Sequence, residues 1–287
     1  MRRVSWAVEL RESNIMNEHV RHSMPHSETG FSLDKKVALI TGGGRGIGVG
    51  IAEIYLEAGA TVIINALTDV HLAKVVARLK LSHGDRVIGL VGDAASAAGA
   101  GDIVVRATDR AGPIDILVNG VGDAIVGRLI EDAGQELAMA VARIQSIIDL
   151  NMMSAIHCAR AVGSGMIQRK GGRIINMTGV IGGLKGESGL GIYSAAKAGV
   201  AGFTRSLARE WAPYGITVNA IAPGVFPDME NLPPEHYQMI QETYLDRIPM
   251  GRFGRPREIG YLALYLAADA SQYLSGQTLV LDGGLSA

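Results

Sequence analysis

One local pattern constrains the fold of this chain more than any other. A short aliphatic run, VALIT at 37–41, passes directly into the glycine-rich turn GGGRGIG at 42–48 and then into a helical segment. Glycines in such a turn let backbone N–H groups approach a phosphate closely, and the following helix N-terminus adds positive potential. The Gly-Lys-Ser/Thr ending of a nucleoside-triphosphate loop is missing, so the pattern predicts a dinucleotide site on an α/β fold.

Further aliphatic runs of similar length follow along the chain, separated by segments with helical periodicity such as 48–60 and 194–215. Runs without polar alternation are typical of strands buried on both faces of a parallel sheet. The expected fold is therefore a single doubly wound Rossmann-type parallel sheet with helices on both faces. The predicted strands are VALIT (37–41), TVIIN (61–65), VIGLV (87–91), IDILVN (114–119), RIINMT (173–178), ITVNAIA (216–222) and TLVLDG (278–283).

The α/β pattern occupies residues 31–287, a length that is compatible with one domain. Residues 1–30 are polar and lack apolar periodicity, which predicts a flexible N-terminal extension. Its histidines, His19, His22 and His26, have no evident acidic or cysteine partner, so no metal site is expected. The stretch 225–255 holds four of the nine prolines and little strand pattern, and we interpret it as a substrate lid.

Charge and composition favour a small-molecule partner. The net charge is −1 with no block of like charge, which argues against nucleic-acid binding. No apolar run approaches the ~20 residues that span a bilayer, and no signal peptide is recognisable, so we expect a cytoplasmic protein without a membrane partner. The single cysteine, Cys158, lies in an apolar stretch and is expected to pack in the core.

Tyr193 and Lys197 are candidate catalytic residues because they lie four positions apart on a predicted helix, where both side chains project from one face. A phenol has an unperturbed pKa of ~10, and a neighbouring ammonium group stabilises the phenolate and lowers that pKa. Tyr193 is thereby expected to exchange a proton with a substrate oxygen while hydride transfer occurs at the adjacent carbon.

The spacing T-G-x-x-x-G-x-G, through Thr41, Gly42, Gly46 and Gly48, combined with Y-x-x-x-K, resembles the short-chain dehydrogenase/reductase family over residues 31–287, in particular its members similar to 3-oxoacyl-carrier-protein reductase. The resemblance implies an NAD(P)-dependent oxidoreductase acting on a ketone or secondary alcohol, assembled as a homotetramer or homodimer. It also implies that Asn151, in DLNMMSA, anchors a proton-relay water and that Lys197 holds the nicotinamide ribose.

The selectivity between NADP and NAD depends on the segment after the second predicted strand. The acidic residue that binds the adenosine ribose in NAD-selective proteins is replaced by Ala66, whereas Arg45 and Thr68 are suited to a 2′-phosphate. NADP is therefore favoured over NAD, with Asp69 as the residue that would support NAD after a shift of one position. The cofactor site expected from the motif and the resemblance comprises Thr41, Gly42, Gly44, Arg45, Gly46, Ile47, Gly48, Asn65, Thr68, Asp93, Ala94, Asn119, Gly120, Tyr193, Lys197, Pro223 and Gly224.

The chain departs from the family pattern at two points. The serine that donates a hydrogen bond to the substrate oxygen is replaced by Gly179, and loss of such a donor typically costs ~10²- to 10³-fold in rate. Thr178, Ser188 or a polar group of the substrate are the possible replacements, although Thr178 should face away unless the strand end is bulged. The segment N-G-V-G at 119–122 also lacks the second asparagine of N-N-A-G, which usually braces the sheet.

The missing serine keeps two alternatives open. A lyase, dehydratase or epimerase that uses the cofactor without net redox would tolerate its loss better than a simple reductase would. The second alternative is a non-catalytic nucleotide-binding protein, although sensing a nucleotide does not require Tyr193, Lys197 and Asn151 together.

Overall fold

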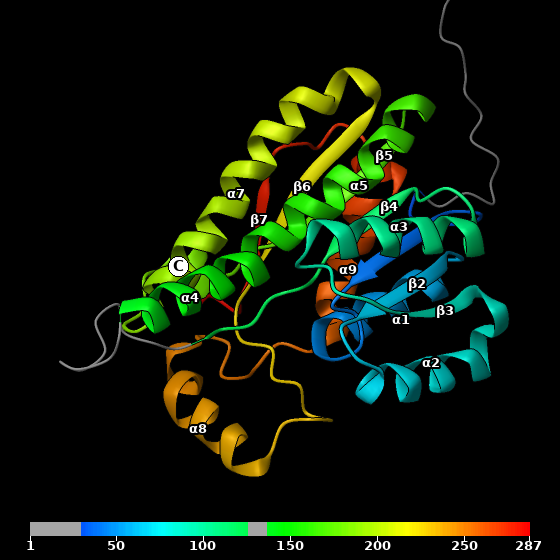
Figure 1. Ribbon diagram of the computed structural model, residues 1–287. Helices are drawn as coiled ribbons and strands as arrows, with labels where there is room; N and C mark the ends of the chain where they lie inside the picture. The colour runs from blue at the N-terminus through cyan, green and yellow to red at the C-terminus, as the bar shows by residue number, and fades with distance from the viewer. Residues whose placement is uncertain (1–29, 126–136) are drawn as a thin grey trace, which may run out of the picture.

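The computed structural model describes residues 30–125 and 137–287. Within them a seven-stranded parallel sheet has the order β3-β2-β1-β4-β5-β6-β7, with helices on both faces (Figure 1). This order confirms the predicted doubly wound fold, and the ends of each strand agree with one of the predicted aliphatic runs to within two residues. The strands are β1 (Val37–Thr41), β2 (Thr61–Ala66), β3 (Val87–Val91), β4 (Ile116–Asn119), β5 (Gly172–Met177), β6 (Ile216–Pro223) and β7 (Thr278–Leu281).

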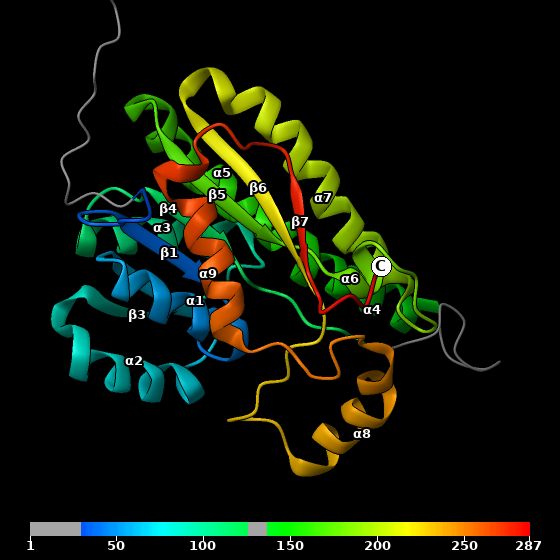
Figure 2. The same ribbon diagram turned by 180° about the vertical axis from the view of Figure 1, so that it is seen from behind.

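Two hydrophobic layers hold the helices against the sheet. On one face lie α1 (Gly46–Glu57), α2 (Asp69–His83) and α9 (Pro256–Ala267), whose apolar side chains share a cluster with β1 and β2 (Figure 2). On the other face α3 (Ala97–Ala111), α5 (Ser154–Arg169) and α7 (Gly191–Trp211) share a second cluster. Cys158 lies in this second cluster and is fully buried, as its apolar surroundings in the sequence predicted.

The helices α1 and α9 approach each other unusually closely because glycines line their contact. A Cβ atom built on Gly50 would lie 2.3 Å from the carbonyl carbon of Pro256, and one built on Gly260 would lie 2.5 Å from the oxygen of Gly50. The buried phenol of Tyr55 donates to the carbonyl oxygen of Ala263 at 3.0 Å, which fixes the register of the pair. This contact sets the position of the first turn of α1, where the cofactor site is expected.

Buried amides brace the centre of the sheet. Asn119, at the end of β4, donates to Asn176 Oδ1 at 2.8 Å, and Asn176 donates to the hydroxyl of Thr204 on α7 at 2.9 Å. The chain thus has a sheet brace although Gly120 replaces the second asparagine of the family segment. Asn65 connects neighbouring strands in the same way on the other half of the sheet, through the carbonyl oxygen of Leu90 at 3.1 Å.

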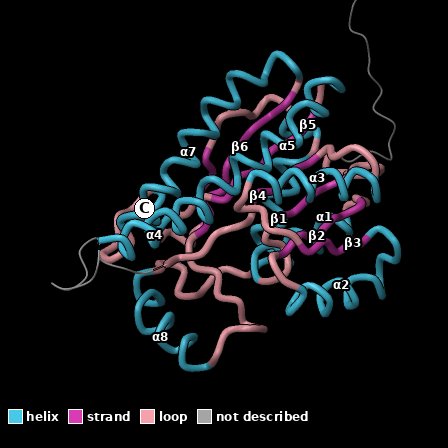
Figure 3. Tube along the Cα trace, viewed as in Figure 1, coloured by secondary structure: helices cyan, strands magenta, loops and turns pink. Residues whose placement is uncertain are grey.

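The remaining helices lie near the carboxyl ends of the strands (Figure 2 and Figure 3). They are α4 (Leu137–Ile148), which runs through a π-helical turn (Asp149–Met153) into α5, the short α6 (Val180–Gly183), and α8 (Pro234–Tyr244) with a 3₁₀ turn (Leu245–Arg247). The stretch predicted as a lid therefore contains a helix. The predicted N-terminal extension lies outside the described residues except for Gly30, and no helix in the described part of the chain is long and apolar enough to cross a bilayer.

Candidate active site

The glycine turn forms a cradle that side chains would fill. A Cβ atom on Gly42, whose φ is +65°, would lie 2.9 Å from the carbonyl oxygen of Gly120, and one on Gly48 would lie 2.6 Å from the Cα of Gly43. Helix α1 begins at Gly46 without a side-chain cap and without an acidic residue of its own in the first turn. A glycine-lined turn at an uncapped helix N-terminus fits the pyrophosphate of a dinucleotide.

The residues predicted at the adenosine end line the rim of this cradle. Arg45 and Thr68 are exposed, and Thr68 precedes the first residue of α2. The carboxylate of Asp93 accepts from the backbone N–H of Ala95 at 2.9 Å and holds the turn after β3. The side chain of Asn65 binds within the sheet. Its backbone contacts the glycine turn, because its carbonyl oxygen accepts from the N–H of Gly43 at 2.9 Å.

The remaining predicted cofactor positions lie at the same edge of the sheet. A Cβ atom on Gly44 would lie 3.1 Å from the Cβ of Ala66, which places the glycine turn against the end of β2. Pro223 ends β6, and the backbone N–H of Gly224 donates to Leu281 O at 2.9 Å, so β7 fixes this turn. Thr41 is the last residue of β1, Ile47 lies in the first turn of α1, and Ala94 is buried after β3.

The three predicted catalytic residues come together beside Gly122. Tyr193 lies in the first turn of α7, and the Nζ atom of Lys197, one turn later, is 5.8 Å from the centre of its ring. A Cβ atom on Gly122 would lie 2.6 Å from this Nζ and 2.8 Å from Asn151 Oδ1, so a side chain at 122 would displace both groups. Lys197 is buried, and its ammonium group donates to Met177 O at 3.1 Å.

Asn151 lies within a continuous helical segment. It occupies the π-helical turn between α4 and α5, where its Nδ2 donates to Ile147 O at 3.1 Å and its Oδ1 accepts from the N–H of Asp123 at 3.0 Å. A π-helical turn opens the backbone of a helix locally and is frequent at functional sites. The turn fixes Asn151 and connects it to the loop that passes over Lys197.

The electrostatics of the pair differ from the sequence-based expectation. Burial raises the pKa of Tyr193 to about 12, with smaller contributions in the same direction from Asp123 and Tyr244. Burial also lowers the pKa of Lys197 to about 8. The predicted lowering of the tyrosine pKa is therefore wrong for this arrangement, because the loss of solvation of the phenolate outweighs the nearby ammonium group. At neutral pH Tyr193 is a neutral phenol, which is the form that donates a proton.

Gly179 lies directly opposite the phenol oxygen of Tyr193, since a Cβ atom built on it would be 3.3 Å from that oxygen. Thr178 is buried, and its hydroxyl donates to the carbonyl oxygen of Ile221 on β6 at 3.1 Å. Its hydrogen is therefore directed at β6, as expected for a strand neighbour of Gly179 that faces the other way. Ser188 is exposed in the loop that precedes α7.

Sequence reasoning missed a second phenol near Tyr193, that of Tyr244 at the end of α8. The guanidinium group of Arg247 stacks over the Tyr244 ring at 5.2 Å and binds the carboxylate of Glu187, in the loop before α7, at 2.8 Å. Ile248 is buried in a small cluster with Val180, the neighbour of Gly179. These contacts place the end of α8 at the mouth of the site, and the i, i+3 spacing of Tyr244 and Arg247 was the available sequence signal.

The fold and this constellation define a nicotinamide-dependent oxidoreductase of the Rossmann class. A family model described as enoyl-(acyl carrier protein) reductase matches residues 42–286. The 3-oxoacyl-[acyl-carrier-protein] reductase of Synechocystis is 37% identical over 260 residues, which cover 88% of this chain and 98% of that protein. The corresponding reductase FabG of Vibrio harveyi is 36% identical over 259 residues, with 89% and 99% covered.

Solved structures agree with these relatives. A gluconate 5-dehydrogenase from Burkholderia cenocepacia, in complex with NADP and tartrate, is 33% identical, with a TM-score of 0.79 and coverage of 89% of this chain and 97% of that one. The chain belongs to the short-chain dehydrogenase/reductase family. This membership confirms the predicted reaction class, hydride transfer between a nicotinamide cofactor and a ketone or secondary alcohol, and does not favour the lyase, epimerase or non-catalytic alternatives.

Proposed function

We propose that this protein reduces the ketone of a 3-oxoacyl thioester with NADPH, with Tyr193 as the proton donor. The observation that carries the proposal is the neutral phenol of Tyr193, held beside the buried ammonium group of Lys197 and facing the open position at Gly179. The similarity to 3-oxoacyl-[acyl-carrier-protein] reductases, which extends over nearly their whole length, supports this substrate class.

Each residue of the proposed site has a separate role. The glycine turn at 42–48 would hold the pyrophosphate, and Lys197 would anchor the nicotinamide ribose. The chemistry that a reduced nicotinamide would supply when bound there is a hydride for the carbonyl carbon. Tyr193 gives its proton to the carbonyl oxygen, and the ammonium group of Lys197 stabilises the phenolate that remains. Asn151 keeps the loop at Asp123 in place and positions a water that returns a proton to the site. In the oxidation direction each transfer reverses.

Tyr244 is the second hydroxyl donor in this proposal. A carbonyl oxygen bound against Tyr193 needs another donor for the charge that develops on it, and Gly179 has no side-chain donor. The Thr178 hydroxyl is directed at β6, and Ser188 is exposed. Tyr244 is supported by its stacking on Arg247, by the ion pair that ties Arg247 to the loop before α7, and by its effect on the pKa of Tyr193.

The preference for NADP over NAD is supported by the charges around the glycine turn. Arg45 is exposed at the rim and can form paired hydrogen bonds with a 2′-phosphate, and Thr68 can add a third. The end of β2 carries Ala66 in place of a ribose-binding acid. Asp69, in the first turn of α2, is the residue through which NAD selectivity would arise instead.

Assembly as a homotetramer or homodimer, and a cytoplasmic location, complete the proposal. The edge strand β7 supports self-association, because within the described residues its outer side pairs with no other strand and Val280 on it is 42% exposed.

The substrate class is tested by following NADPH absorbance with acetoacetyl-CoA as the thioester and 5-oxogluconate as a sugar ketone. The proposal expects turnover of the thioester at a higher kcat/KM and a 3-hydroxyacyl product. Turnover of the sugar ketone alone would retain the reaction class and contradict the thioester assignment.

A further inference from the structure

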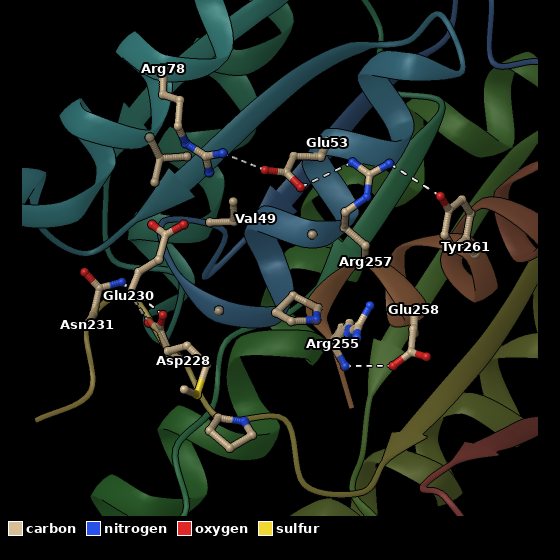
Figure 4. Close-up of a pocket in the computed structure, with 16 residues that line it drawn as sticks. Val49, Glu53, Arg78, Asp228, Glu230, Asn231, Arg255, Arg257, Glu258 and Tyr261 are labelled. Atoms are coloured by element: carbon tan, nitrogen blue, oxygen red, sulfur yellow. Dashed lines mark hydrogen bonds and ion pairs between the residues drawn. The ribbon is translucent and has the colours of Figure 1, made fainter. Parts of the chain in front are cut away.

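A cavity of about 460 Å³ lies on the outer side of α1 and does not include Tyr193 or Lys197 in its lining. The start of α1, the start of α9 and residues 227–231, here called the lid segment, enclose it (Figure 4). On one wall Glu53 binds Arg78 at 2.8 Å and Arg257 at 3.4 Å. Arg257 also binds Glu57 at 2.8 Å, so these two arginines and two glutamates neutralise one another. Arg255 and Glu258 also line the cavity, and the lid segment adds the carboxylates of Asp228 and Glu230.

One of these carboxylates, that of Asp228, lies at the first residue of α1. A Cβ atom on Gly46 would be 3.7 Å from the Cβ of Asp228 and 4.0 Å from its Oδ2. Helix α1 has no side-chain cap and no acidic residue in its own first turn. Asp228 therefore places a negative charge from a distant part of the sequence at the positive end of this helix dipole, where such a charge is favourable.

The lid segment holds this carboxylate in a fixed orientation. The side-chain amide of Asn231 donates to Asp228 Oδ1 at 3.1 Å and to Oδ2 at 2.9 Å, as the close-up shows (Figure 4). The backbone N–H groups of Asn231 and Leu232 both donate to the carbonyl oxygen of Asp228, at 3.2 and 2.9 Å. Asp228 thus begins a closed turn whose own hydrogen bonds direct the carboxylate.

We propose that Asp228 docks the lid segment on the cofactor turn and competes with the cofactor pyrophosphate for the positive end of α1. Both groups are anionic, and both are favoured by the same uncapped N-terminus. Dinucleotide binding therefore weakens the contact between Asp228 and α1 and couples cofactor occupancy to release of the lid segment. This inference rests on the proposed placement of the cofactor at residues 42–48.

The test is the Kd of NADPH, measured by fluorescence titration without any substrate. Asp228→Asn keeps the shape of the side chain and removes its charge, so we expect the Kd to fall about three- to tenfold. The difference in Kd between Asp228→Asn and the unmodified protein should be smaller at about 0.5 M salt, where charge interactions are screened. Glu230→Gln is the matched control, because it makes the same change of charge two residues along the lid segment and is expected to leave the Kd within about twofold.

Two results would overturn the inference. An Asp228→Asn protein that folds normally and binds NADPH with unchanged or weaker affinity would show that the carboxylate does not oppose the cofactor. An equal gain in NADPH affinity from Glu230→Gln would show a general electrostatic effect of the surface charge instead of a local effect of Asp228 at Gly46. Arg45→Ala tests the proposed cofactor turn itself. If Arg45→Ala and Asp228→Asn both leave the Kd of NADPH unchanged, the proposed cofactor site is wrong. If only Arg45→Ala weakens NADPH binding, only the role of Asp228 is rejected.

Discussion

Gly179 and Tyr193 face each other so closely that a Cβ atom on the glycine would lie 3.3 Å from the phenol oxygen. The backbone of Gly179 is extended, with φ of −173°, so other residues can adopt its conformation. A serine there would place its hydroxyl close to the phenol oxygen of Tyr193. Compared with the serine of the family pattern, Gly179 therefore lacks one hydrogen-bond donor, while Tyr193, Lys197 and Asn151 are all present.

If Tyr244 compensates for that loss, removing its hydroxyl should impair the reaction and restoring the serine should repair it. We expect Tyr244→Phe to lower kcat/KM on the order of 10²-fold, the usual effect of losing one oxyanion donor. Adding Gly179→Ser to this variant should recover a large part of the loss. The measurement is steady-state NADPH oxidation with acetoacetyl-CoA for the two single variants and the double variant.

Tyr237→Phe serves as the control for this series, because Tyr237 lies on the same helix and packs edge-on against Phe253 at 6.0 Å. Its kcat/KM should match that of the unmodified protein. Full activity in Tyr244→Phe, or a double variant no better than Tyr244→Phe alone, would exclude Tyr244 as the substitute donor.

The pH dependence of reduction should follow Lys197 and not Tyr193. The pKa of Lys197 is lowered to about 8, so its ammonium form predominates below that pH and the neutral amine above it. The neutral amine cannot stabilise the Tyr193 phenolate, and kcat/KM for reduction should therefore fall as pH rises through about 8. Tyr193, with a pKa raised to about 12, remains a proton donor over the whole range. A profile that stays flat up to pH ~10, near the pKa of an unperturbed lysine, would contradict this assignment.

Arg45 should decide between the two dinucleotides. Its guanidinium group is exposed at the rim of the turn, so its removal should leave the fold intact. A charge-assisted hydrogen bond contributes ~1.5–3 kcal/mol, so Arg45→Ala should raise the KM for NADPH about 10- to 100-fold while the KM for NADH changes little. Equal effects on both cofactors would show that Arg45 does not bind the 2′-phosphate.

The amide brace of the sheet should contribute to stability. Asn176→Ala removes the acceptor of Asn119 and the donor to Thr204, all three of which are buried. Each buried hydrogen bond lost typically costs ~0.5–1.5 kcal/mol, so losing both should cost ~1–3 kcal/mol, which urea unfolding would detect. Gln238→Ala, an exposed amide on α8 paired with Glu242, is the comparison and should change the free energy of unfolding by less than ~0.5 kcal/mol. Equal stability of both variants would contradict the role of the brace.

The sheet was predictable because its strands are apolar on both faces and are separated by glycine turns and helical periodicity. Helix ends were less accurate: the predicted helix at 194–215 begins at Gly191 and ends at Trp211, because a 3₁₀ turn containing Pro213 follows it. The proximity of Tyr193 and Lys197 was predictable because both residues share one helical face. Their pKa values were not, because burial is set by packing of segments far apart in the sequence.

Two features of the site depend on contacts that no local pattern encodes. Tyr244 reaches the site through Arg247 and Glu187, which are 60 positions apart. Asp228 reaches the first turn of α1 from the loop after β6. Both residues belong to the stretch predicted as a lid, where short-range periodicity carries little information about tertiary contacts.

The most direct test of the account is NADPH oxidation by the unmodified protein and by Tyr193→Phe, assayed with acetoacetyl-CoA and accompanied by NADPH titration. Phenylalanine keeps the ring and removes only the donated proton, so turnover should fall by ~10²- to 10⁴-fold, the usual contribution of a general acid. The NADPH Kd should stay within about threefold, a change of less than ~1 kcal/mol. Turnover by Tyr193→Phe at the rate of the unmodified protein would contradict the central claim that Tyr193 donates the proton.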